Sequence, residues 1–242
     1  MGKQYWRGGN MLYPVPAVMV SCGRPEERPN IITVAWAGTV CSSPAMVSIS
    51  VRKERYSYDI LKETGEFVIN LITRDLTYAT DFCGVRSGRD VDKFAQMHLT
   101  PLPSQHISAP GIAESPVNLE CKVTQVIPLG SHDMFLAEVL GVTVDEKYMD
   151  VNGKIHLNDA GLVAYSHGEY FELGEKLGKF GYSVAKKQAA KPESVTKSAK
   201  PSGAGKKAAS AENRTASKTG AGNRRKSASK TGSADKQKSR RK

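Results

Sequence analysis

The sequence predicts a mainly β domain, a barrel or sandwich with a few peripheral helices, followed by a disordered basic tail. Up to Ala185, short runs rich in β-branched and aromatic residues alternate with Gly, Pro and charged turn residues. Strands at such short spacing favour a barrel or sandwich over alternating βαβ units. After Ala185, Lys, Ala, Ser, Gly and Thr dominate and no aromatic residue occurs. We therefore expect a folded domain over residues 1–185 and a disordered Lys/Ala/Ser-rich tail over residues 186–242.

The expected strands follow one another along the chain. The runs "AVMVSCG" and "NIITVAWAG" flank a turn, "GRPEERP". In "AMVSISV", Met and Ser side chains share one face and Val and Ile side chains share the other. "EFVINLI" is a fourth strand, and "VNLECKVTQVIPLG" and "HDMFLAEVLGVTVDEKYMD" form a long pair. Asn152-Gly153 predicts a tight hairpin turn after that pair.

Three helices are expected between these strands. In "RYSYDILKETG", Ile60 and Leu61 have helical spacing with Thr64, and Gly65 can end the helix. In "TRDLTYATDFCG", Thr73 is the expected N-cap and Gly84 the expected terminator. "SGRDVDKFAQM" predicts a short third helix after Gly88.

The stretch "RPNIITVAWAG" combines a strand pattern with two unusual side chains. Asn30 and Trp36 are six residues apart, so an unbroken strand would point both to one face. At about 3.3 Å per residue they would lie about 20 Å apart. A buried asparagine amide needs hydrogen-bond partners, which an ordinary core strand does not supply. This strand is therefore expected either to face a ligand or to be ordinary core.

The charge is divided unevenly along the chain. Residues 186–242 hold eighteen Lys and Arg against three Asp and Glu, a net charge of +15, and the remainder carries a net charge of −4. A disordered polycation binds nucleic acid without sequence preference and weakens as salt rises, and without aromatic residues it does not stack on bases. Non-specific nucleic-acid contact and a solubilising role both stay open for the tail.

The sequence lacks the features of several classes of function. No apolar run reaches the roughly 20 residues that cross a bilayer, and the N-terminus lacks the features of a signal peptide. The four cysteines are widely spaced without a CxxC, so we expect no metal site and free thiols in a reducing cytoplasm. There is no GxSxG, HExxH or P-loop, and "CGVRSGRD" does not match a dinucleotide fingerprint.

A candidate anion site follows the strand at residues 45–51. The basic loop from Arg52 to Arg55 leads to Ser57 at an expected helix start. Guanidinium groups, a hydroxyl and the free N–H groups of a helix together suit a phosphate. The alternative is a solvated turn in which Ser57 serves only as an N-cap.

Four segments in the same order carry a family resemblance. They are "NIITVAW", "SPAMVSISVRKERYSYDILKETGEFVINL", "DFCGVRSGRDVDKF" and "YFELGEKLGKFG". Together they resemble the flavin-reductase-like FMN-binding proteins, most closely the flavoredoxins, over residues 13–182. The resemblance implies an FMN-binding split β-barrel, usually a homodimer, with FMN held noncovalently near the dimer interface.

The resemblance also implies the residues that contact FMN. The matching side chains are those of Asn30, Trp36, Ser57, Lys93, His132 and Tyr165. Ser57 stands where relatives often have threonine, and Tyr165 stands at an aromatic position. Further contacts are implied at Cys41, Ser42, Ser43, Ser48, Ser50, Val51, Arg52, Arg55 and Phe82. Without the resemblance, Trp36 and Tyr165 are half-buried core aromatics, Lys93 is a surface lysine and His132 is a histidine in a strand-connecting turn.

The resemblance implies an oxidoreductase that moves electrons through bound FMN. One version is a reductase that takes hydride from NADH or NADPH, and the other is a carrier that receives electrons from a protein donor. An alternative hypothesis on function is a non-catalytic FMN carrier that is tethered to nucleic acid through its basic tail. No catalytic residue is assigned, and the donor and acceptor stay open.

Overall fold

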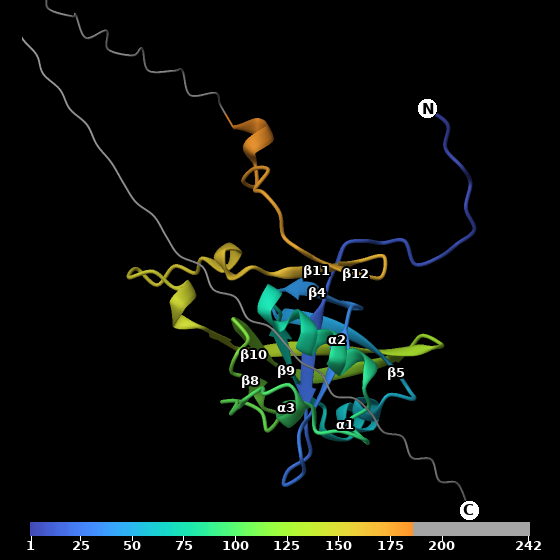
Figure 1. The fold of residues 1–242 in the computed structure, drawn as a ribbon, viewed down its shortest axis with the longest axis vertical. Coiled ribbons are helices and arrows are strands. Elements are labelled where there is room, and N and C mark those ends of the chain that lie inside the picture. Colours follow the sequence, from blue (N-terminus) through green and yellow to red (C-terminus); the bar gives the residue numbers. More distant parts are fainter. Residues whose placement is uncertain (186–242) are drawn as a thin grey trace, which may run out of the picture. The chain divides into compact units, whose positions relative to one another are not determined.

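A seven-stranded antiparallel sheet forms the centre of residues 1–185, the part of the chain that this computed structural model describes (Figure 1). Its strand order is β3-β2-β6-β9-β10-β5-β4. The bounds are β2 (Val18–Cys22), β3 (Asn30–Val34), β4 (Ala37–Ser42), β5 (Ala45–Arg52), β6 (Glu66–Leu71), β9 (Val117–Pro128) and β10 (His132–Val144). A three-stranded sheet has the order β1 (Val15–Pro16), β11 (Val163–Ser166), β12 (Glu169–Glu172). A two-stranded sheet pairs β7 (Pro101–Leu102) with β8 (Gly111–Ile112).

The two edge strands of the large sheet, β3 and β4, are consecutive in the chain. Ala35 and Trp36 alone separate them, and the N–H of Ser50 in β5 donates to the Trp36 carbonyl at 2.8 Å. The sheet therefore curls until its edges meet at Trp36. Along the rest of its length β3 pairs with β2 alone, which leaves the barrel open on that side. The predicted mainly β split barrel with few helices is confirmed.

The prediction of one unbroken strand from Asn30 to Trp36 is wrong. β3 ends at Val34, and the chain bends at Ala35 and Trp36 before β4 begins. β2 begins at Val18, which pairs with Val34, so no residue of β2 continues the ladder opposite Trp36, and the Trp36 carbonyl accepts the Ser50 N–H of β5 instead. Within β3 the alternation holds: Ile32 and Val34 face the barrel interior with Asn30, and Ile31 faces the opposite side.

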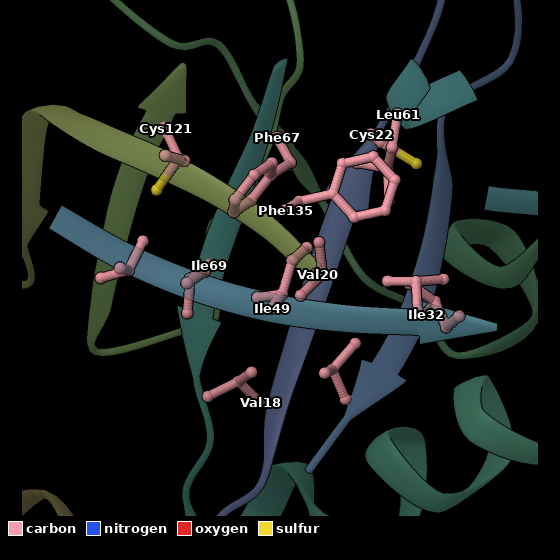
Figure 2. Packing of buried hydrophobic residues seen from close by; sticks show 14 of the residues in the cluster. Val18, Val20, Cys22, Ile32, Ile49, Leu61, Phe67, Ile69, Cys121 and Phe135 are labelled. Atoms are coloured by element: carbon pink, nitrogen blue, oxygen red, sulfur yellow. The ribbon is translucent and has the colours of Figure 1, made fainter. Parts of the chain in front are cut away.

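Apolar side chains cover both faces of β2 and β3, which explains their continuous apolar pattern. Figure 2 shows the interior cluster, where Val20, Ile49, Phe67 and Phe135 point toward one another from four different strands. Full burial of such a side chain stabilises the fold by about 1.5–3 kcal/mol. The second cluster, which includes Met19, packs β2 and β3 against the helices outside the barrel.

The first helix begins and ends as the sequence indicates. The helices are α1 (Tyr56–Thr64), α2 (Thr77–Val85) and α3 (Lys93–Gln96), with short 3-10 turns η1 (Arg74–Leu76), η2 (Glu146–Tyr148), η3 (Leu157–Ala160) and η4 (Tyr182–Val184). Gly65 ends α1 at φ 62°, where its N–H donates to the Leu61 carbonyl at 3.0 Å. Ser57 is not the N-cap, because Arg55 occupies that position and makes no side-chain capping bond.

Two of three local predictions need correction. Gly84 does not end α2, which continues to Val85. A Cβ at position 84 would approach the Thr33 Cβ to 3.1 Å, so glycine permits the close packing of α2 on β3. The short helix predicted after Gly88 is confirmed at Lys93–Gln96, where the Asp92 carboxylate caps it by accepting the Ala95 N–H at 3.1 Å. His132 is the first residue of β10, not part of the turn, because it pairs with Arg52.

The remaining predictions concern the later part of the domain and the tail. The paired long strands are confirmed as β9 and β10, and the turn at Asn152 is confirmed by Gly153 at φ 76°, whose N–H donates to the Asp150 carbonyl. The four thiols are unpaired, and three of them are buried. Within residues 1–185, every helix is too short or too polar to cross a bilayer. The predicted disorder of residues 186–242 lies outside the described residues.

Candidate functional site

Three adjoining hollows follow β3 and form one groove, which we call the β3 groove. The Asn30 cavity, about 300 Å³, lies at the start of β3. The central hollow, about 140 Å³, lies between β3, the end of β5 and His132, and the Trp36 hollow, about 260 Å³, lies beside α2 and β11. Ile32 and Arg55 line both of the first two hollows, and Trp36 lines both of the last two. The groove therefore occupies the open side of the barrel.

The floor of the Asn30 cavity consists of buried polar groups. The Asn30 side-chain amide donates to the Ser57 hydroxyl at 2.7 Å, and both residues are buried. The Lys93 ammonium donates to the carbonyls of Ile31 at 2.6 Å and Cys83 at 2.8 Å. These bonds connect β3, α1, α2 and α3 at one point, so the fold itself positions the polar floor.

Lys93 is the chemically unusual group in this floor. It is 3% exposed, and burial lowers its pKa to about 8. Among residues 1–185, no carboxylate lies within ion-pair distance of its ammonium. An anion in the cavity would therefore stabilise the protonated form. The interpretation of Lys93 as a surface lysine is wrong.

A segment of four residues, Arg86 to Arg89, forms the rim of the Asn30 cavity, and we call it the lip. Arg28 donates to the Gly88 carbonyl at 2.8 Å, and the Arg89 guanidinium lies 5.3 Å from the centre of the Tyr56 ring. A Cβ on Gly88 would come within 2.1 Å of the Asn30 Oδ1. Glycine is therefore required for the lip to lie this close to the floor.

The Asn30 cavity has an excess of positive charge. Arg55, Arg86, Arg89 and Lys93 line it, against one carboxylate, Glu54, which already pairs with an arginine outside the cavity. Guanidinium groups bind phosphate through paired hydrogen bonds. The cavity is therefore built to hold a phosphate-sized anion.

The central hollow is lined by residues of β3 and β5 and by one titratable ring. Ser50, Val51 and Arg52 come from the end of β5, and His132 comes from the start of β10. Burial and the positive charges of Arg52 and Arg55 lower the pKa of His132. Its imidazole is therefore neutral at pH 7. Nδ1 lies 2.9 Å from the Ser131 hydroxyl, which leaves Nε2 as the nitrogen for a ligand.

Aromatic rings surround the Trp36 hollow. Trp36, Tyr165 and Tyr170 line it, and Tyr13 packs against Trp36 and Tyr165 with ring centres 6.4 and 6.2 Å away. The Tyr170 hydroxyl donates to the Asp81 carboxylate at 3.3 Å, and burial together with this carboxylate raises the pKa of Tyr170 to about 12. Such walls suit a flat ring ligand.

The structure brings ten of the fifteen predicted cofactor residues into the β3 groove: Asn30, Trp36, Ser50, Val51, Arg52, Arg55, Ser57, Lys93, His132 and Tyr165. The other five line none of the three hollows. Cys41 and Ser42 lie at the end of β4, Ser43 lies in the following turn, and Ser48 lies on β5 between β4 and β10. Phe82 packs against the second apolar cluster.

Sequence patterns miss the lip and part of the aromatic wall. The segment "CGVRSGRD" fails as a dinucleotide fingerprint, yet its two arginines and two glycines are the signal for an anion-binding loop. Tyr13, Asp81 and Tyr170 carry no such signal. Asp81 of α2 and Tyr170 of β12 line the Trp36 hollow, and Tyr13, which precedes β1, packs against its lining residues Trp36 and Tyr165. They come together only because these distant segments converge there.

The comparison with protein families identifies the family of this domain. A family model described as "Flavin reductase like domain" matches residues 10–174. The chain belongs to this family. Its match covers the whole β3 groove, so the predicted resemblance to flavin-reductase-like FMN-binding proteins is confirmed.

Individual relatives agree with this membership. Flavoredoxin of Desulfovibrio vulgaris (Miyazaki F) is 33% identical, with a TM-score of 0.71 over 76% of this chain and 100% of the flavoredoxin. Flavoredoxin from Methanosarcina acetivorans is 24% identical with a TM-score of 0.68 over 76% of this chain and all of its own, and shares the fold. An uncharacterized protein of Archaeoglobus fulgidus is 31% identical over 160 residues, which are 66% of this chain and 88% of the relative. Family membership supports flavin binding and an oxidoreductase function.

Proposed function

We propose that this flavin reductase like protein binds FMN in the β3 groove and transfers electrons through it. The observation that carries the proposal is the polarity of the groove, which runs from a cation-rich cavity to an aromatic hollow. FMN has the same polarity, with a phosphate at one end and a flat isoalloxazine ring at the other. The similarity to a flavoredoxin over that protein's whole length supports the same cofactor.

The phosphate belongs in the Asn30 cavity. Ser57 and Lys93 supply donors from the floor, and Arg55 with the arginines of the lip supplies positive charge. The first turn of α1 adds N–H groups that no side chain caps. Since four cations face one carboxylate there, the cavity selects a phosphorylated flavin over riboflavin.

The isoalloxazine belongs between the central hollow and the Trp36 hollow. Trp36 and Tyr165 provide ring surfaces, and the neutral imidazole of His132 provides a hydrogen-bonding group at the ring edge. The bound flavin supplies the redox chemistry. The chain holds the phosphate, orients the ring and limits the access of water to it.

The visible absorption spectrum of the purified protein tests the proposal. We expect a yellow protein, or one that turns yellow and retains FMN after FMN is added and excess is removed. A protein that stays colourless after this treatment would refute FMN binding. Anaerobic bleaching by NADH or NADPH at catalytic rates then identifies a reductase, and the absence of bleaching identifies a carrier that needs a protein donor.

We propose that the protein acts as a homodimer. Three apolar side chains, Val40 of β4 and Leu140 and Val142 of β10, are 51%, 40% and 55% exposed, although β-sheet faces usually bury such groups. A second copy that packs against β4 and β10 would cover these side chains. Light scattering at micromolar concentration should give twice the monomer mass, and Val142→Lys should shift the protein toward the monomer; a monomeric wild type would contradict the dimer.

For the tail, residues 186–242, we propose non-specific contact with nucleic acid. The second candidate function is therefore a flavin carrier that is tethered to nucleic acid. Its support is the net charge of +15 over residues 186–242. The full chain should retain DNA at low salt and lose it at high salt, and a chain that ends at Ala185 should not retain it. Equal retention by both chains would exclude this role.

We also propose the cytoplasm as the compartment, on the basis of the cysteines. All four thiols are unpaired, and Cys41 is partly accessible. Unpaired thiols persist where the surroundings are reducing. Cell fractionation with an antibody against the chain tests this placement, and recovery in an oxidising compartment would contradict it.

A further inference from the structure

One buried carboxylate lies directly behind the β3 groove without lining it. Asp133, on β10, is 4% exposed and faces the barrel interior, on the same side as Phe135. It pairs with Val51, next to the pair formed by His132 and Arg52. Both residues of that neighbouring pair line the central hollow. Asp133 therefore sits immediately behind the groove wall.

The carboxylate of Asp133 contacts two residues at the mouth of the barrel. The Tyr58 hydroxyl donates to its Oδ2 at 2.5 Å, and the Lys53 ammonium lies 3.4 Å from its Oδ1. Oδ1 is buried and accepts no hydrogen bond from residues 1–185, so its partner there is the lysine charge. The hydrogen bond from Tyr58 is the main cause that lowers the pKa of Asp133, and the carboxyl is ionised at pH 7.

These two partners belong to the segments that face the phosphate in the Asn30 cavity. Tyr58 directly follows Ser57 in the first turn of α1, and Lys53 lies within the basic loop between Arg52 and Arg55. No local side-chain cap holds that first turn, because the N-cap residue Arg55 makes no capping bond. The position of the turn and the loop therefore depends on tertiary contacts, and Asp133 supplies one to each.

We infer that Asp133 is a positioning residue that holds the helix start and the basic loop in the geometry that binds a flavin phosphate. The inference rests on the proposed function, because it concerns the same cavity. It goes further by naming a residue outside the groove that sets the preference for phosphorylated flavin over riboflavin. The ring end of the groove depends on Trp36 and Tyr165, which have no hydrogen bond to this carboxylate.

The test compares FMN with riboflavin, which has the same ring and no phosphate. Asp133→Asn retains the shape and removes the charge, and Tyr58→Phe removes only the hydroxyl. Each should raise the Kd for FMN about tenfold, the scale of one charged hydrogen bond, and change the Kd for riboflavin less than about twofold. Because both act through one contact, the double variant should lose less than the product of the single losses.

Glu120 provides a matched control in the same sheet. It is also a buried carboxylate, on β9, and it accepts the backbone N–H groups of Gln105 at 3.0 Å and His106 at 2.8 Å. It lines none of the three hollows. Glu120→Gln should lower the melting temperature and leave the ratio of the FMN and riboflavin Kd values unchanged.

Two results would overturn the inference while the proposed function stands. One is an equal loss of FMN and riboflavin affinity in Asp133→Asn, which would show a general structural role. The other is unchanged affinity for both flavins in Asp133→Asn and Tyr58→Phe. If Asp133→Asn does not fold, Tyr58→Phe alone decides. A wild-type protein that binds neither flavin would refute the proposed function itself, and the inference with it.

Discussion

The two ends of the β3 groove are built from different interactions. At the Asn30 end, buried donors such as Lys93 are held by specific hydrogen bonds and the charge is strongly positive. At the Trp36 end, half-buried rings meet one another at tilted or edge-on angles, with few hydrogen bonds among them. Hydrogen bonds to charge depend on distance and direction, whereas ring packing tolerates small shifts. The phosphate end should therefore determine selectivity, and the ring end should add affinity for any flavin.

Among the variants that test the difference between the two ends, Lys93→Met should have the largest effect on FMN affinity. The variant removes one charged donor from the phosphate and leaves the carbonyls of Ile31 and Cys83 without it. A charged hydrogen bond contributes about 1.5–3 kcal/mol, so the Kd for FMN should rise roughly 10- to 100-fold in a fluorescence titration. Riboflavin affinity should change much less. Lys154→Met, at an exposed position that lines none of the three hollows, is the control. Equal losses of affinity for both flavins in Lys93→Met would remove the distinction between the two ends.

Gly88→Ala should act on the lip alone. The new Cβ would lie 2.1 Å from the Asn30 Oδ1, so the lip must move away from the cavity floor. Such overpacking costs about 1–3 kcal/mol of stability, and FMN affinity should fall about tenfold while riboflavin affinity stays the same. Thermal unfolding and flavin titration measure the two effects. Gly38→Ala, where a Cβ meets no atom within 4 Å, should change neither, and wild-type FMN affinity in Gly88→Ala would exclude the lip from phosphate binding.

Trp36→Ala should weaken the binding of FMN and of riboflavin by the same factor. An aromatic pair contributes about 0.5–1.5 kcal/mol beyond the area it buries, so each Kd should rise at least about 2- to 10-fold. Trp36→Phe should recover most of the loss because it keeps a ring surface. Trp6→Ala is the matched control, since that tryptophan is 77% exposed in the N-terminal segment. A loss confined to FMN would place the phosphate, not the ring, at this end.

The smallest expected effect is a dependence of FMN affinity on pH. In the free protein the pKa of Lys93 is about 8, below its ordinary value because burial disfavours the charge. A bound phosphate favours the charge and raises that pKa, so binding takes up a proton above about pH 8. FMN affinity should therefore decrease as the pH rises above about 8, at most tenfold per pH unit, and riboflavin affinity should stay level. Parallel slopes for both flavins, or an FMN affinity that rises with pH, would contradict this role of Lys93.

Local patterns predict the regular elements of this domain well. The strands of the central sheet alternate as expected, and α1 ends at Gly65, because periodicity and left-handed glycines act within a few residues. The failures lie where a distant group decides the local structure. β3 ends before Trp36, whose carbonyl accepts the Ser50 N–H of β5, and Gly84 lies inside α2, where its missing Cβ permits the close approach of Thr33.

The candidate site also contains residues that the sequence predicts and residues that only the structure brings together. Family motifs in the sequence point to Asn30, Ser57 and Lys93, and the structure joins them by hydrogen bonds around one cavity. No sequence pattern relates Tyr58 to Asp133, which are 75 residues apart, or brings Tyr13 beside Tyr165.

The sequence by itself determined that this chain forms a β-rich flavin reductase like domain and that residues 186–242 are strongly basic. Those properties follow from periodicity, composition and motif order, which act locally or are shared by relatives. Only the tertiary structure decided that the barrel stays open along β3 and that the groove changes from charge to aromatic surface along its length. Long-range pairing and burial determine those features, because both depend on which distant segments meet.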